Sequence, residues 1–308
     1  MKNQLIQSFI EKHTLNDGFK EVALKWFIPI AELIYDHQIR AKSPLFLGIN
    51  GSQGSGKSTL TDFLNFYLSE CYQLNVENVS LDDFYLSKKE RLALAKSVHP
   101  LLKTRGVPGT HDTELMATSL QKLKSKAVNF PLPRFNKATD DPSPLAEWPI
   151  VSKEVDLVIF EGWCWGTPPQ NDEQLKEAIN SLEAEQDKTK SWRSYVNEQL
   201  TTHYQPLYSQ MDLWLMLKAP SFDCVANWRK QQEHKLLAAN QGKDISGVMS
   251  DAEVELFIQH YQRLTEQSLN QLPEKCDLTL SLDEHRKILT SSGPLAIKLK
   301  AQQEVTLE

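Results

Sequence analysis

The feature that most constrains the fold of this chain is the stretch GINGSQGSGKST at residues 48–59. The chain has only 12 glycines in 308 residues, yet four of them fall here. Gly51, four further residues, Gly56, Lys57 and Ser58 match the phosphate-binding pattern G-x-x-x-x-G-K-[ST]. Glycine allows positive φ angles and lets backbone N–H groups approach a polyphosphate closely. The spacing therefore predicts a loop that holds the phosphates of a nucleotide.

The sequence on either side of this loop supports the interpretation. The apolar run LFLGI at 45–49 is typical of a buried strand, and residues 58–72 carry apolar side chains at helical spacing. A strand, a glycine loop and a helix are the context that the pattern requires. In that context Lys57 reaches the β- and γ-phosphates and Ser58 is a ligand of Mg²⁺. The residues expected at the nucleotide are Gly51, Ser52, Gln53, Gly54, Ser55, Gly56, Lys57, Ser58 and Thr59.

The chain as a whole has the composition of an ordinary globular protein, with 40% hydrophobic and 24% charged residues. Its length suits a single domain over residues 1–308. A net charge of −6 favours neither nucleic acid nor an anionic membrane as a partner. The four cysteines are widely spaced, and the first residues lack the apolar region of a signal peptide. We therefore expect a cytoplasmic protein whose partner is a small molecule.

Five strand candidates alternate with helical segments after residue 42. They are LFLGI (45–49), VENVSL (76–81), VDLVIF (155–160), LWLML (213–217) and DLTLSL (277–282). Such an alternation predicts an α/β fold with three layers, in which helices cover both faces of a parallel sheet. Residues 1–42 are expected to form an N-terminal helical extension, and residues 166–200 a helical insertion.

Acidic residues directly follow two of the predicted strands. Asp82 and Asp83 come after the second strand, and Glu161 comes after the third. Ligands of open α/β sheets bind beyond the carboxyl ends of the strands, where a carboxylate can accept the proton of an attacking hydroxyl or help to hold Mg²⁺. We assign the first role to Asp82 and the second to Glu161. Helix capping is the alternative for such residues, and Asp83 remains an alternative base.

Two turn-rich segments carry basic residues suited to an anionic acceptor. RGVPGTHD at 105–112 contains Arg105 and His111, and PRFNK at 133–137 contains Arg134 and Lys137. A guanidinium group can bind a carboxylate or phosphate through two parallel hydrogen bonds. The alternatives are a helix cap near His111 and a solvated basic turn at 134–137.

Residues 221–262 predict a helical hairpin. Ser250 and Glu253 form a capping box at the start of its second helix. Two helices joined by a polar connection could act as a lid that excludes water from bound nucleotide, with Arg229 reaching the phosphates. A hairpin with no such role explains the same pattern equally well.

Together, the segments GSQGSGKST, SLDDFYL, RGVPGTHD, PRFNK, IFEGW and NWRKQQE resemble the D-glycerate 3-kinase family of plant and fungal type, within the P-loop kinases. The resemblance implies a five-stranded parallel sheet of strand order 2-3-1-4-5. It implies ATP and Mg²⁺ as cofactors and phosphoryl transfer to an alcohol group of a small acid, with Asp82 as the base. It places the acceptor near Asp83, Tyr85, Arg105, His111, Arg134 and Lys137.

One segment departs from the pattern of that family. The family usually has Asp where this chain has Asn136, followed by a G-x-G-D-R element, whereas ATDDPSPLAEWP follows here. D-glycerate is the expected acceptor, and another small acid or sugar alcohol is the main alternative. A nucleotide-dependent switch without an acceptor is a second alternative, but it has no need of the basic segments at 105–112 and 133–137.

Overall fold

The computed structural model describes residues 2–16, 18–239 and 249–307. Its helices are α1 (Lys2–His13), α2 (Phe19–Val22), α3 (Ile28–Gln38), α4 (Lys57–Tyr72), α5 (Lys88–Ser97), α6 (Thr113–Lys124), α7 (Ser181–Gln186), α8 (Ser191–Gln199), α9 (Gln205–Tyr208), α10 (Phe222–Ala239), α11 (Asp251–Gln271) and α12 (Ala296–Leu307). Its strands are β1 (Leu45–Gly51), β2 (Val76–Ser80), β3 (Phe130–Pro131), β4 (Phe135–Asn136), β5 (Asp141–Pro142), β6 (Ile150–Val151), β7 (Leu157–Gly162), β8 (Leu213–Lys218), β9 (Leu278–Leu282) and β10 (Ile288–Ser292).

The main sheet contains six strands within these described residues, in the order β10-β9-β8-β1-β7-β2. The five strands from β9 to β2 are parallel to one another, and β10 pairs antiparallel with β9. The five parallel strands stand in the predicted order 2-3-1-4-5, but the sheet has a sixth, antiparallel strand that was not predicted. The sequence did not predict β10, because its residues ILTSS (288–292) are mostly exposed and lack the apolar pattern of an inner strand.

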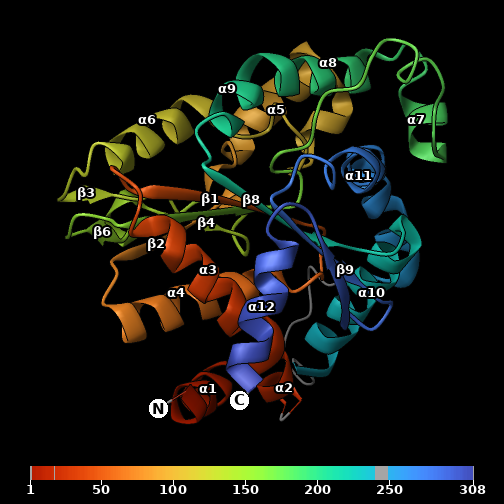
Figure 1. Ribbon diagram of the computed structural model, residues 1–308. Coiled ribbons are helices and arrows are strands. Elements are labelled where there is room, and N and C mark those ends of the chain that lie inside the picture. Colours follow the sequence, from red (N-terminus) through yellow and green to blue (C-terminus); the bar gives the residue numbers. More distant parts are fainter. Residues whose placement is uncertain (1, 17, 240–248, 308) are drawn as a thin grey trace.

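Helices cover both faces of this sheet, so that the protein has three layers (Figure 1). α3 and α4 lie on one face together with α12, which packs against α3. α5, α6, α8 and α9 lie on the other face. The N-terminal segment and the C-terminal helix therefore lie side by side on one face, although they stand at opposite ends of the chain.

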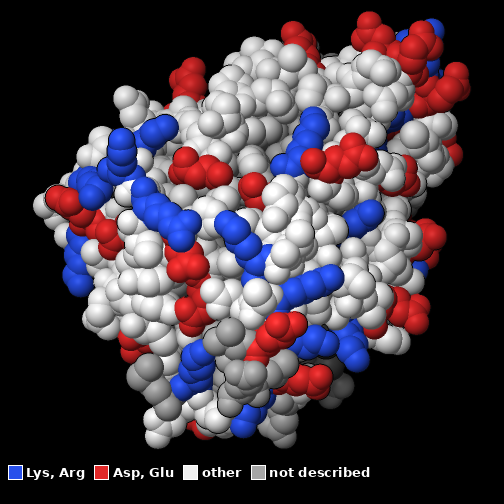
Figure 2. Space-filling view, viewed as in Figure 1, with Lys and Arg blue, Asp and Glu red and all other residues white. Residues whose placement is uncertain are grey.

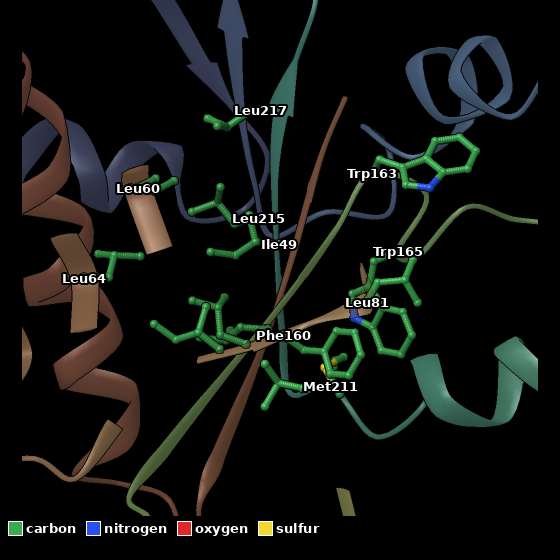
Figure 3. Close-up of a cluster of buried hydrophobic side chains, with 14 of the residues drawn as sticks. Ile49, Leu60, Leu64, Leu81, Phe160, Trp163, Trp165, Met211, Leu215 and Leu217 are labelled. Carbon is green, nitrogen blue, oxygen red and sulfur yellow. The ribbon is translucent and has the colours of Figure 1, made fainter. Parts of the chain in front are cut away.

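The core between α4 and the sheet fixes the position of the glycine loop. All of β1 is buried, and Leu60 and Leu64 of α4 lie close to Ile49 in the layer between helix and sheet (Figure 3). On the other face, the ring of Phe160 in β7 stacks on Trp165 with 3.8 Å between ring centroids. Burial of each such side chain contributes about 1.5–3 kcal/mol to the stability of the fold. The strand and the helix that flank the loop are therefore held firmly against each other.

Two helical segments of the sequence analysis have a more varied structure than expected. In the segment 166–200, residues 166–180 are not helical, and α7 and α8 follow them. α10 and α11 pack against each other as a hairpin, and α11 continues to Gln271, beyond the predicted end. The connection at 240–248 lies outside the described residues.

The molecular surface mixes charges of both signs. On the face that Figure 2 shows, Lys and Arg side chains are interspersed with Asp and Glu. Within the described ranges, none of the helices combines the length and the apolarity that crossing a membrane requires.

Candidate active site

The loop between β1 and α4 forms a cradle of backbone. Gly54 and Gly56 have φ angles of +77° and +91°, which L side chains rarely adopt. A Cβ on Gly54 would also lie 2.8 Å from the Cβ of Trp228 in α10, so glycine is required there by contact as well. α4 begins at Lys57, and its free N–H groups and dipole favour an anion at this end.

Polar side-chain atoms of the loop are available to a ligand. Ser52 Oγ, Gln53 Oε1 and Ser55 Oγ are buried and have no hydrogen-bond partner among the described residues. Buried polar atoms in folded proteins nearly always have partners. The unused hydrogen-bonding capacity of the loop therefore fits the phosphates of a nucleotide.

Arg286 supports the loop from a distant part of the chain. It lies between β9 and β10 with a φ angle of +68°, and its Nε donates a 2.7 Å hydrogen bond to the carbonyl oxygen of Gly54. Its guanidinium group lies 5.1 Å from the ring centroid of Trp228 and donates a hydrogen bond to Gln231. The sequence analysis missed Arg286. Arg286 lies four residues beyond the end of β9, and no local pattern marks its contact with Gly54.

Glu161 and Lys57 meet beside the cradle. The Oε1 atom of Glu161 accepts a 2.9 Å hydrogen bond from Ser80 at the end of β2, and Lys57 Nζ lies 3.6 Å from Oε2. Oε2 is buried and accepts no hydrogen bond from the described residues. Ser58, the next residue of α4, is exposed.

The side-chain oxygens of Ser58 and Glu161 fit a magnesium site. No group of three or more His, Cys, Asp or Glu side chains suited to a metal occurs in the part of the chain that the structure describes. Mg²⁺ at nucleotide sites is usually held by one or two protein ligands together with phosphates and water. Ser58 and Glu161 are a donor set of that kind.

Asp82 stands at the centre of the predicted site. Tyr85 donates a 2.8 Å hydrogen bond to Oδ1, and Lys137 donates a 2.6 Å hydrogen bond to Oδ2. Burial acts to raise the pKa of Asp82, but the charges of Lys137 and Lys57 and the two hydrogen bonds outweigh burial and lower the pKa to about 2. Asp82 is therefore ionised at neutral pH.

Asp83 has a different environment from its neighbour. Its carboxylate accepts a hydrogen bond from the N–H of Phe135 at 3.3 Å and lies 3.5 Å from the guanidinium group of Arg134. Burial, with the charge of Asp82 added, raises the pKa of Asp83 to about 6, although Arg134 and the Phe135 N–H oppose the shift. Asp83 and Arg134 thus hold β4 in place.

His111 is also placed behind the site. Its ring stacks on Tyr85 with 4.6 Å between centroids, and its Nδ1 forms a 2.6 Å hydrogen bond with the hydroxyl of Tyr204. Burial lowers the pKa of His111 to about 3, so the ring is neutral. His111 was expected near the acceptor, and in the structure its ring contacts Tyr85 but does not line the cavity described next.

A cavity of about 150 Å³ lies between the phosphate loop, Asp82 and the helical hairpin. The predicted site residues that line it are Gln53, Lys57, Asp82, Tyr85, Arg105, Lys137 and Arg229. Trp163, Phe257 and Tyr261 complete the wall and were not predicted. Asp83, His111 and Arg134 are not among the lining residues: Asp83 pairs with Arg134 and accepts from the Phe135 N–H, and His111 stacks on Tyr85.

The two arginines at this cavity, like Lys57 and Lys137, have carboxylate partners. Arg105 forms an ion pair with Asp140, which also pairs with the buried Arg91 at 2.8 Å. Arg229 forms an ion pair with Glu233, one helical turn further along α10. Both guanidinium groups are thereby held in fixed positions at the cavity wall.

A second, larger cavity of about 440 Å³ opens on the other side of the loop. Ser55, Gly56 and Thr59 form one wall, residues 285–288 another, and Phe19 with neighbouring side chains of the N-terminal segment a third. A site that is continuous with the phosphate cradle and more apolar than the first cavity suits a nucleoside.

No family model matches this chain, but characterised and uncharacterised kinases do. It is 34% identical over 262 residues to an uncharacterized kinase of Schizosaccharomyces pombe, mug58, and this match covers 79% of the chain and 89% of that protein. It is 31% identical over 227 residues to the chloroplastic D-glycerate 3-kinase of Arabidopsis thaliana, a match that covers 71% of the chain and 46% of that protein. The chain belongs to the kinase family of mug58, and its relatives include D-glycerate 3-kinases.

Two solved structures have a similar fold over most of the chain. The D-glycerate 3-kinase of Cryptococcus neoformans matches with a TM-score of 0.70 at 28% identity, over 86% of this chain and 98% of that one. The YGR205w protein matches with a TM-score of 0.71 at 26% identity, over 88% and 97% of the two chains. As a member of the family, the chain is an ATP-dependent phosphotransferase with an alcohol group as acceptor.

Proposed function

We propose that this kinase transfers the γ-phosphoryl group of ATP to a hydroxyl of a small organic acid, and that the acid is D-glycerate, which gives 3-phosphoglycerate. The observation that carries the proposal is the small cavity in which Asp82 stands beside the phosphate loop among Lys57, Arg105 and Lys137. A small cavity rich in cations suits a compact anion. The plant and fungal D-glycerate 3-kinases among the relatives support the same acceptor.

The chemistry needs a base, and Asp82 is the carboxylate that lines the cavity. The acceptor oxygen forms a bond to the γ-phosphorus as the bond from that phosphorus to the β–γ bridging oxygen breaks, and ADP leaves. The hydroxyl proton passes to Asp82. Lys57 stabilises the negative charge on the transferred group. Asp83 does not line the cavity, which makes it the weaker candidate for the base.

The remaining groups hold the nucleotide. Ser58 and Glu161 would hold Mg²⁺, which neutralises charge on the β- and γ-phosphates in this class of reaction. The phosphates would lie in the cradle of residues 51–59, and the nucleoside in the 440 Å³ cavity between the cradle and residues 285–288.

A kinase for another small acid is the second candidate. The segment that departs from the family, around Asn136, contains Asp140, and Asp140 already engages Arg105. A guanidinium group with a carboxylate partner contributes less to an anionic acceptor than a free one. A different acid could therefore replace D-glycerate without any change in the reaction.

The test is ATP consumption with Mg²⁺ in the presence of D-glycerate, pantothenate, uridine, ribulose 5-phosphate or no acceptor. We expect D-glycerate to stimulate turnover, and Asp82→Asn to lower kcat by about 10²-fold or more, the usual contribution of a general base. Asp172→Asn, at an exposed position, serves as the control. If D-glycerate gives no more turnover than the empty control, the proposed acceptor is wrong, and stimulation by another compound would identify the class to which it belongs.

A further inference from the structure

The proposed base is engaged on both of its oxygens. The hydroxyl of Tyr85 lies 2.8 Å from Oδ1 of Asp82, and the ammonium group of Lys137 lies 2.6 Å from Oδ2. An acceptor hydroxyl must give its proton to a carboxylate that already has a cation against it. A cation in that position stabilises the ionised form and so opposes proton transfer to Asp82.

The two partners of Asp82 differ in their freedom to move. Tyr85 is buried, and its ring is held against His111. Lys137 comes directly after the short strand β4, and its side chain is 60% exposed. Its flexible four-carbon stem lets the ammonium group turn away without a change in the backbone. Of the two partners, Lys137 is therefore the one that can move away from Asp82.

Lys137 also differs from the neighbouring cations in what it binds. Arg105 pairs with Asp140 and Arg229 pairs with Glu233, and neither carboxylate lines the cavity. Across the described residues, the carboxylate that pairs with Lys137 is the base itself. Withdrawal of Lys137 by an incoming anion therefore changes the state of the base directly.

We propose that Lys137 couples recognition of the acceptor to activation of the base. The acid group of the acceptor takes the ammonium group of Lys137 from Asp82, and Asp82 then accepts the hydroxyl proton as the acceptor oxygen bonds to the γ-phosphorus and ADP leaves. Water carries no acid group, so the ion pair persists and ATP is not hydrolysed when the acceptor is absent. The inference rests on the proposed function for its acceptor class, a hydroxy acid.

The first test is ATP hydrolysis without any acceptor. Lys137→Met removes the ammonium group, and we expect its acceptor-free rate to exceed that of the unaltered protein by about tenfold or more, the equivalent of one charge-assisted hydrogen bond. Lys137→Arg retains a cation and should show a smaller increase. Lys176→Met is the matched control, because Lys176 forms a 2.6 Å ion pair with Glu173, is 55% exposed and lies outside the cavity.

The second test separates the acid group from the hydroxyl. With D-glycerate, Lys137→Met should raise KM by about tenfold or more. Glycerol has the hydroxyls without the carboxylate, and we expect the variant to phosphorylate it at least as well as the unaltered protein does. The double variant Asp82→Asn, Lys137→Met should lose the gain in acceptor-free hydrolysis, because that gain runs through Asp82.

The outcomes distinguish this inference from the proposed function. An acceptor-free rate of Lys137→Met that equals or falls below that of the unaltered protein overturns the inference, whatever the acceptor is. A gain that persists in the double variant overturns it too. A gain that depends on Asp82, in a protein that does not use D-glycerate, supports the coupling and refutes the proposed acceptor.

Discussion

Asp83 adjoins the proposed base along the chain, and its carboxylate should destabilise the fold at neutral pH. The pKa of Asp83 rises from 3.8 to about 6 in the folded protein, chiefly through burial. The protonated carboxyl of Asp83 therefore contributes to the free energy of unfolding. This contribution is fully present below pH 3.8 and is lost as the pH rises through about 6, because the buried group ionises. At about 1.4 kcal/mol per pH unit, the loss at pH 8 amounts to about 3 kcal/mol.

Asp83→Asn removes this cost, because an amide does not ionise. The amide oxygen can still accept the hydrogen bond from the N–H of Phe135. We expect the free energy of unfolding at pH 8 to exceed that of the unaltered protein by up to about 3 kcal/mol, and the difference to shrink as the pH falls toward 4.

Urea unfolding followed by tryptophan fluorescence at pH 8, 6 and 4.5 measures the effect, with the exposed Asp172→Asn as control. A variant that is less stable than the unaltered protein at pH 8 would refute the reasoning. That result would mean that the attraction between Asp83 and Arg134 outweighs the cost of burial. A difference in stability that does not change with pH would also refute it, because the effect would then not arise from ionisation.

Two further substitutions test the phosphate cradle. Gly54→Ala places a Cβ at a φ of +77° and 2.8 Å from Trp228, so we expect a loss of at least about 1–2 kcal/mol in stability together with weaker ATP binding, measured by thermal unfolding with and without nucleotide. Normal stability and normal ATP affinity would contradict the steric argument. Arg286→Ala removes the hydrogen bond to the Gly54 carbonyl and the contact with Trp228, so KM for ATP should rise by about tenfold while KM for the acceptor stays nearly constant. An unchanged KM for ATP would show that the loop keeps its shape without Arg286.

Local patterns in the sequence predicted the parts of this protein that depend on neighbours along the chain. The glycine spacing between residues 48 and 59 predicted the loop, because positive φ angles and the start of a helix are local properties. The capping box of Ser250 and Glu253 is confirmed at the start of α11 for the same reason. The apolar runs likewise predicted the five parallel strands, since burial on both faces leaves a clear signal.

The sixth strand and several members of the site could not be found in this way. β10 is an edge strand with exposed side chains, so the hydrophobic pattern that marks inner strands is missing. Arg286 reaches Gly54 across 232 positions of sequence, and no local pattern reports such a contact. Trp163 and Tyr261 likewise meet at one cavity only because the fold brings together the end of β7 and the helical hairpin.

The glycine spacing is enough to predict a phosphate-binding loop, and the segments around it show which residue types are near. The pairing of the charged residues, in contrast, follows from contacts between distant segments. In the folded protein Lys137 donates a hydrogen bond to Asp82, and Arg105 forms an ion pair with Asp140. The buried ring of His111 stacks on Tyr85. The physical reason is that pairing and burial depend on distances between segments far apart in the chain, whereas a loop of glycines depends on the backbone angles of a few consecutive residues.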